Sequence, residues 1–65
     1  MSTVVDFNSS VFVFIENTYG KSISRKVKQK NNSDVVDRIL EDSRSKDYSV
    51  EKTANKIIAM LRINP

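Results

Sequence analysis

The sequence predicts an α+β fold, in which a β-hairpin or three-stranded antiparallel meander is followed by two α-helices packed on one face of the sheet. Three observations favour this fold. The longest apolar run, residues 11–15, consists of β-branched and aromatic side chains, which suit strands. The only glycine, Gly20, follows this run at a position suited to a tight turn. The second half of the chain carries apolar residues at helical spacing.

Up to three strands are predicted in the first half of the chain. Residues 3–7 form a short segment rich in β-branched and aromatic side chains, and a polar cluster follows it. The clearest strand is 11–16, and 17–20 suit a type I turn that Gly20 closes at positive φ with a bulge. Residues 21–30 then return antiparallel to the second strand.

Alternation along this hairpin divides its side chains between two faces. The face expected in the core contains Val11, Val13, Ile15, Ile23, Arg25 and Val27. The opposite face combines two aromatic rings with a basic row, namely Phe12, Phe14, Lys26, Lys28 and Lys30. This combination is unusual for a face that only meets water, so we regard it as the candidate binding surface.

Two amphipathic helices are predicted after the hairpin. The first spans 34–45, with a cap at Ser33 or Asp34. Its apolar stripe contains Val35, Val36, Ile39 and Leu40. The second spans 50–62 after a cap at Ser49. Its apolar stripe contains Val50, Ala54, Ile57, Ile58 and Leu61.

The hairpin with its glycine-closed turn, followed by a helix that opens at Ser33 and Asp34, resembles the first half of a β-grasp (ubiquitin-like) fold. The resemblance covers residues 11–42 and is one of pattern. A β-grasp fold continues into further strands, whereas a second helix is predicted here. No function is therefore carried over from that fold.

The composition points to one small domain, residues 1–65, without a catalytic or metal-binding signature. The chain has no Cys and no His, which removes disulfides, thiolate sites and the commonest metal ligand. It also has no Gly-rich phosphate loop. We therefore expect no cofactor and no enzymatic activity. The absence of a signal peptide and of a long apolar segment leads us to expect a cytoplasmic protein without a membrane partner.

The positive charge is concentrated in one segment. Residues 1–32 contain five bases and two acids, whereas residues 33–65 contain six of each, so the net charge of +3 lies in the first half. All five bases of that half fall within 21–30. A concentrated basic segment raises the local density of an anionic partner.

Three interpretations of the candidate binding surface remain open. A helix or a second copy of the chain buries the phenylalanines, nucleic acid binds there, or a protein docks on the apolar patch. We predict a nucleic-acid-binding regulator that uses Arg25, Lys26, Lys28 and Lys30, with Lys52 and Lys56 on the last helix. The alternative is a protein-binding adaptor or inhibitor, of accessory or phage type, that uses Phe12, Phe14 and Tyr19. These residues would also be the contact of a homodimer, which we expect because the core is small.

The two predicted helices can also be compared with a helix-turn-helix motif. The second helix would then present Lys52, Asn55, Lys56 and Arg62 to DNA. The connection lacks the glycine that such turns often contain, and the first helix is acidic. A helical hairpin packed on the sheet is therefore the favoured interpretation.

Overall fold

The computed structural model describes residues 4–63, and within this range it contains helices and no strand. The elements are α1 (Val4–Tyr19), α2 (Lys21–Val27), the 3-10 turn η1 (Lys30–Asn32), α3 (Ser33–Ser45) and α4 (Val50–Leu61). The predicted α+β fold, with its hairpin or meander, is therefore wrong. The β-grasp resemblance does not hold either. Thr3, where the first predicted strand begins, lies outside the described residues.

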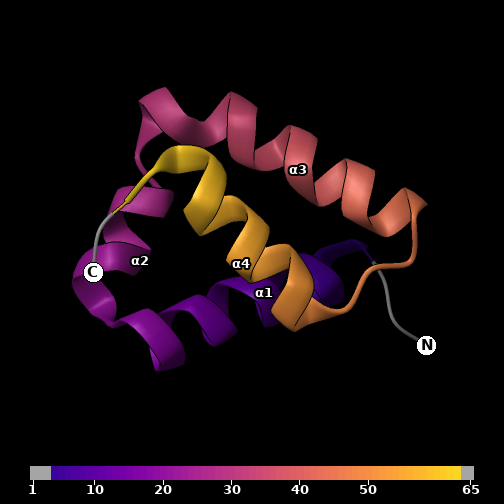
Figure 1. Cartoon of the computed structure of the whole chain (residues 1–65), viewed down its shortest axis with the longest axis horizontal. Helices are drawn as coiled ribbons and strands as arrows, with labels where there is room; N and C mark the ends of the chain where they lie inside the picture. Colours follow the sequence, from indigo (N-terminus) through magenta and orange to yellow (C-terminus); the bar gives the residue numbers. More distant parts are fainter. Residues whose placement is uncertain (1–3, 64–65) are drawn as a thin grey trace.

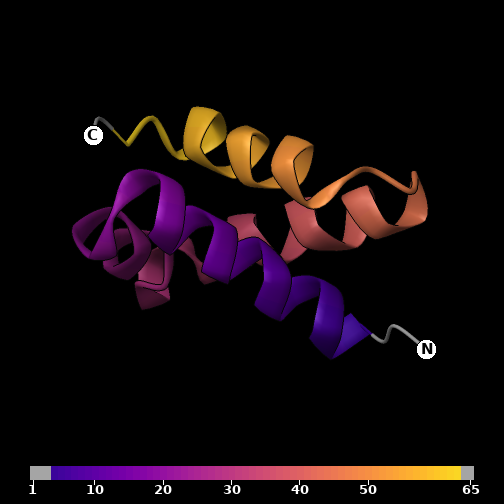
Figure 2. The same cartoon turned by 90° about the horizontal axis from the view of Figure 1, so that it is seen from below.

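The last helix, α4, packs against each of the other three α-helices. Figures 1 and 2 show α3 and α4 side by side and running in opposite directions, with α1 on the other side of α4. The short helix α2 lies at one end of the long axis of the molecule, and the connection between α3 and α4 lies at the other end. The two ends of this axis therefore present different surfaces.

Helix α1 replaces two predicted strands because its apolar residues recur every four positions. Phe7, Val11, Ile15 and Tyr19 follow this spacing, which places them on one side of a helix. Val11 and Ile15 are fully buried, whereas Val13 is 57% exposed. A step of two residues corresponds to about 200° of rotation on a helix, so the side chain of Val13 points away from those of Val11 and Ile15. A strand would have buried all three.

One of the polar residues that were predicted to end the first strand makes a side-chain contact with another helix. Asn8 lies inside α1 and is half-buried. Its Oδ1 atom accepts a hydrogen bond of 2.8 Å from Nη1 of Arg44 on α3. The amide oxygen of Asn8 thus has a hydrogen-bond partner 36 positions away, and α1 continues through Asn8.

Gly20 separates α1 from α2, and the prediction that it adopts positive φ is confirmed, with φ 98° and ψ 166°. The residue joins two helices instead of closing a hairpin. Its N–H donates to the carbonyl of Glu16, and its own carbonyl accepts from Ser24 N–H, both at 3.0 Å. The chain therefore changes direction without losing the last hydrogen bond of α1 or the first of α2.

The two later helices were predicted within one residue of their observed bounds. Ser49 caps α4 as predicted, because its hydroxyl accepts from Lys52 N–H at 3.1 Å. The predicted side-chain cap of α3 is absent. Asn32 precedes α3 without a capping bond, and the Ser33 hydroxyl instead donates to the carbonyl of Lys30. The turn η1 thus leads directly into α3.

Helix α3 ends in a Schellman motif that fixes the start of the next connection. Asp47 adopts a left-handed conformation with φ 58°. The N–H of Tyr48 donates to the carbonyl of Ser43 at 2.9 Å, and the N–H of Asp47 donates to that of Arg44 at 3.2 Å. Tyr48 is consequently held close to the last turn of α3.

All four α-helices contribute to the core. The buried apolar residues are Val11, Ile15, Ile23, Val27, Val36, Ile39, Leu40, Ala54, Ile57 and Ile58. Each of them was predicted to be in the core. Of the other predicted core residues, Val13 and Val35 are exposed, and Val50 and Leu61 are partly buried.

Two substitutions of identical chemistry test the helical register of α1. Val11→Ala should lower the free energy of unfolding by about 1.5–3 kcal/mol, because it removes methyl groups from the core. Val13→Ala should change it by less than about 0.5 kcal/mol, because that side chain is exposed. Urea unfolding followed by circular dichroism measures both. Equal losses for the two variants would contradict the helix and indicate the strand pattern.

The substitution Gly20→Ala isolates a backbone effect. No atom lies within 4 Å of the position that the added Cβ would occupy, so there is no clash. The conformation at φ 98° and ψ 166° is nevertheless one that L-residues avoid, and the strain should cost about 1–3 kcal/mol of unfolding free energy. Urea unfolding of Ser22→Ala, an exposed site on α2, provides the control and should show little change.

Candidate functional site

The five bases of residues 21–30, here called the basic segment, lie at the α2 end of the molecule. They are Lys21, Arg25, Lys26, Lys28 and Lys30, and all five are exposed. The inner side of α2 carries Ile23, Ser24 and Val27, which are buried. Burial of this side leaves the basic side chains of α2 directed to solvent. Asn32 connects η1 to the end of α2, because its Nδ2 donates to the carbonyl of Lys26 at 2.8 Å.

The charge of the basic segment is not neutralised within the described part of the chain. The segment contains no Asp or Glu. The ion pairs found among residues 4–63 involve Asp42, Lys46 and Lys56, and none involves the basic segment. Its five positive charges are therefore available to an external anion.

The predicted face that combined aromatic rings with lysines is absent. Phe12 and Phe14 are two residues apart on α1, which corresponds to about 200° of rotation. Both rings are partly buried against the core. Lys28 lies over the ring of Phe12, with Nζ 5.6 Å from its centroid. Of the three interpretations of the candidate binding surface, the geometry thus favours the one in which the protein itself covers the phenylalanines.

Tyr19, the third residue predicted to contact a partner, makes an internal hydrogen bond. Its hydroxyl donates to Oδ1 of Asn55 at 2.6 Å and so connects the end of α1 to α4. Asn55 was the residue that a helix-turn-helix arrangement would use to read a base. The antiparallel course of α3 and α4 in both views agrees with a helical hairpin (Figures 1 and 2).

An open hollow of about 370 Å³ lies beside Phe14, where α1 meets the start of α4. Its lining residues are Ser9, Ser10, Val13, Phe14, Asn17 and Val50. Neither Phe12 nor Tyr19 lines it. The three residues predicted to contact a protein partner therefore do not form one surface.

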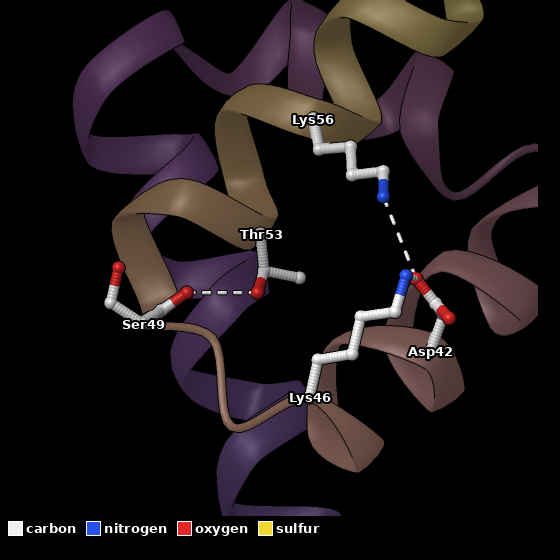
Figure 3. A network of polar contacts seen from close by, with 5 residues as sticks. All are labelled: Asp42, Lys46, Ser49, Thr53 and Lys56. Atoms are coloured by element: carbon white, nitrogen blue, oxygen red, sulfur yellow. Dashed lines mark hydrogen bonds and ion pairs between the residues drawn. The ribbon is translucent and has the colours of Figure 1, made fainter.

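A second group of positive charges, here called the lysine cluster, consists of Lys46, Lys52 and Lys56. Their Nζ atoms lie 5.9, 4.0 and 5.5 Å from the ring centroid of Tyr48. Lys46 and Lys56 also reach the same carboxylate oxygen of Asp42, at 3.3 and 3.5 Å (Figure 3). The cluster thus joins the end of α3 to the outer side of α4.

Sequence reasoning found only part of this cluster. It selected Lys52 and Lys56, which lie on α4 and not in the basic segment. It missed Lys46, Tyr48 and the pairing role of Asp42. The spacing of four between Asp42 and Lys46 was a usable signal. The contact with Lys56 depends on the packing of α3 against α4 and has no local signal.

The lysines change the acidity of Asp42. The hydrogen bond from Lys46 holds the pKa of the Asp42 carboxyl below its usual value, and the charges of Lys46 and Lys56 act in the same direction. Partial burial opposes them by favouring the neutral form. The carboxyl is thus charged at neutral pH and lies between two ammonium groups.

The described residues contain no group of three or more His, Cys, Asp or Glu side chains that could hold a metal ion. Within the same range, no helix combines the length and the apolar character needed to cross a membrane. Comparisons with models of known protein families, with curated proteins and with solved structures gave no match.

The pKa of Asp42 offers a test of the lysine cluster. Lys46→Gln should raise this pKa towards the usual value for Asp, because it removes the hydrogen bond and one positive charge. Arg38→Gln is the control, since Arg38 is also four residues from Asp42 but forms none of the ion pairs found among residues 4–63. A pH titration of the carboxyl carbon by NMR measures each value.

The corresponding effect on stability has a defined sign. A carboxyl with a lowered pKa in the folded state stabilises the fold above its unfolded pKa, and this contribution is lost as the pH falls through the folded pKa. In Lys46→Gln the loss should therefore be smaller than in the parent protein. An equal rise in the Asp42 pKa for Lys46→Gln and Arg38→Gln would contradict the observed pairing.

Proposed function

We propose that the protein is a non-catalytic, nucleic-acid-binding regulator, and that the basic segment contacts the phosphodiester backbone. The observation that carries this proposal is the set of five exposed bases within ten residues, without an acid among them. Ammonium and guanidinium groups that neutralise backbone phosphates release counterions, and this release drives association. Ile23 and Val27 anchor α2 in the core, so the segment presents its charges from a fixed element.

Contacts to phosphate, and not to bases, are the basis of this proposal. The ring of Phe12 lies under Lys28 and packs against the core, which leaves it poorly placed to stack on a base. The exposed groups of the segment are four ammonium groups and one guanidinium. Such groups position a protein on nucleic acid without reading its sequence. We therefore expect binding that depends little on base sequence.

We propose that a single copy of the chain performs this function in the cytoplasm. The homodimer was expected because the core is small and because a second apolar face of a sheet would need covering, and only the second of these reasons is lost in a helical chain. A protein adaptor or inhibitor is the alternative function. The hollow beside Val13 and Phe14 is the surface to which its partner would bind, and a protein complex that resists nuclease would favour this alternative.

Two arginine substitutions with the same change in charge test the proposal. Arg25 lies in the basic segment on α2, whereas Arg38 lies on α3, and both are exposed. Affinity for a labelled oligonucleotide is measured by fluorescence anisotropy between about 50 and 200 mM salt. Arg25→Gln should reduce the slope of log affinity against log salt by about 0.7–0.9, the value for one phosphate contact.

Arg38→Gln should leave this slope unchanged, because α3 is outside the proposed interface. The double variant Lys26→Gln/Lys28→Gln should reduce the slope by about twice as much as Arg25→Gln. Equal effects of the two arginine variants would show that total charge, not the basic segment, determines binding. Absence of binding to both duplex and single strands at about 50 mM salt would reject the proposed function.

A further inference from the structure

We propose that the lysine cluster is a binding site for a phosphate group, separate from the basic segment. The ligand class is a tetrahedral oxyanion carrying about two negative charges. It can be a free phosphate compound or a phosphate of nucleic acid, and the experiment below distinguishes these sources. The site is argued from its own geometry and does not rest on the proposed function.

The three ammonium groups converge from two helices. Lys46 follows the last residue of α3, and Lys52 and Lys56 are one turn apart on α4. All three Nζ atoms lie within 6 Å of the centroid of one ring, that of Tyr48. The Schellman motif holds Tyr48 in place through its N–H bond to Ser43. The positions of the charges are therefore set by helix packing and by a defined turn.

The charges in the cluster are unbalanced. The cluster contains three ammonium groups, and two of them, those of Lys46 and Lys56, share the single carboxylate of Asp42. Lys52 has no carboxylate within ion-pair distance among the described residues. It is also four residues before Lys56 on the same helix, and like charges at this spacing destabilise a helix. An excess of two positive charges remains, which matches a phosphate dianion.

Contact with solvent leaves room for such a ligand. The side chains of Lys46 and Lys56 are 53% and 38% exposed, and that of Asp42 is 40% exposed. Figure 3 shows Lys46 and Lys56 approaching Asp42 from different helices. A phosphate oxygen can take the place of the Asp42 carboxylate as their acceptor. Asp42 is thus an internal competitor for the ligand.

The position of the cluster makes it separable from the basic segment. The cluster is built from the end of α3, its connection to α4 and the first two turns of α4, whereas the basic segment belongs to α2 and η1. Figure 1 shows the α3–α4 connection and α2 at opposite ends of the long axis, so we expect a ligand at the cluster to shift different backbone amides from a ligand at the basic segment. NMR of the intact, ¹⁵N-labelled protein can therefore report on each end separately.

The experiment titrates this protein with sodium phosphate, and in parallel with sodium chloride of equal ionic strength. We expect saturable shifts of the amides of Lys46, Tyr48 and Lys52 in phosphate only. A second arm uses a single-stranded oligonucleotide without terminal phosphates. Shifts of the same amides identify backbone phosphate as a ligand, whereas shifts confined to the basic segment identify the cluster as a site for small phosphate compounds.

Three variants separate a binding site from an internal contact. Lys52→Gln should weaken phosphate binding roughly two- to fivefold, as expected for loss of one exposed charge. Asp42→Asn should strengthen it by a similar factor, because the competing carboxylate is gone. Arg62→Asn, at the other end of α4, removes one positive charge outside the cluster and should leave binding unchanged; Asn also tolerates the left-handed conformation there.

Two results would overturn the proposal. One is that the amides shift equally in phosphate and in chloride, which would mean that the shifts report ionic strength and not phosphate binding. The other is an Asp42→Asn variant that keeps its dispersed spectrum but binds phosphate no better, since an internal contact gains nothing from this change. Absence of oligonucleotide binding at about 50 mM salt, which would reject the proposed function, has no bearing on either result, so the two proposals can fail independently.

Discussion

Burial of one side of α4 is the interaction on which the rest of the structure depends. Ala54 and Ile57 of α4 are fully buried, as are Val11 and Ile15 of α1, and α4, like α1, packs against each of the other three α-helices. A chain of 65 residues has little apolar surface to bury, so a central helix shared by three neighbours makes efficient use of it. Removing this helix would leave apolar residues of α1 and α3 facing water, because these two helices have little contact with each other.

The shared helix also explains where the charges are. Because α4 contributes its inner side to the core, its outer side carries Lys52 and Lys56, and the second of these meets Asp42 of α3. At the other end of the molecule, α2 is too short to cover much surface and directs its bases outward. The separation of the two positive groups is therefore a consequence of the packing order of the helices. It places the two anion-attracting surfaces on different elements, one on α2 and η1 and the other on the end of α3 and the start of α4; Figure 2 shows α2 and the α3–α4 connection at opposite ends of the molecule.

The sequence predicted the second half of the chain well because its signals are local. The apolar stripes of α3 and α4 repeat at helical spacing, and Ser49 forms a cap within its own turn. In the first half, Val11, Val13 and Ile15 satisfy the period of a strand, whereas Phe7, Val11 and Ile15 satisfy that of a helix. The strand was predicted because residues 11–15 are β-branched and aromatic, and such side chains favour strands. The polar residues before this run indicated a turn, whereas Asn8 lies inside α1 and contacts Arg44; this contact is long-range, so no window of sequence reveals it.

The candidate sites also divide into features that the sequence alone reveals and features that depend on the fold. The basic segment was identified by composition, which does not depend on the fold, and the structure exposes all five of its bases. They include Arg25, which the predicted strand would have placed on its core face. The pairing of Phe12 and Phe14 depended on alternation, and it was lost with the strand. The lysine cluster needs α3 and α4 to be antiparallel before Lys46 and Lys56 can share one carboxylate. Knowledge of the helices alone therefore could not have located it.

The backbone at Gly20 has a consequence for the handedness of the residue that occupies it. Its φ of 98° and ψ of 166° are the mirror image of an extended conformation that L-residues adopt readily. The position of an L-residue's Cβ is open, so conformational strain and not a clash opposes an L-side chain there. A D-amino acid would therefore accept this conformation with less strain than its L-counterpart and would restrict the unfolded chain more than glycine does. In a chain short enough for chemical synthesis, the junction between α1 and α2 is thus a site where mirror-image chemistry could rigidify the fold.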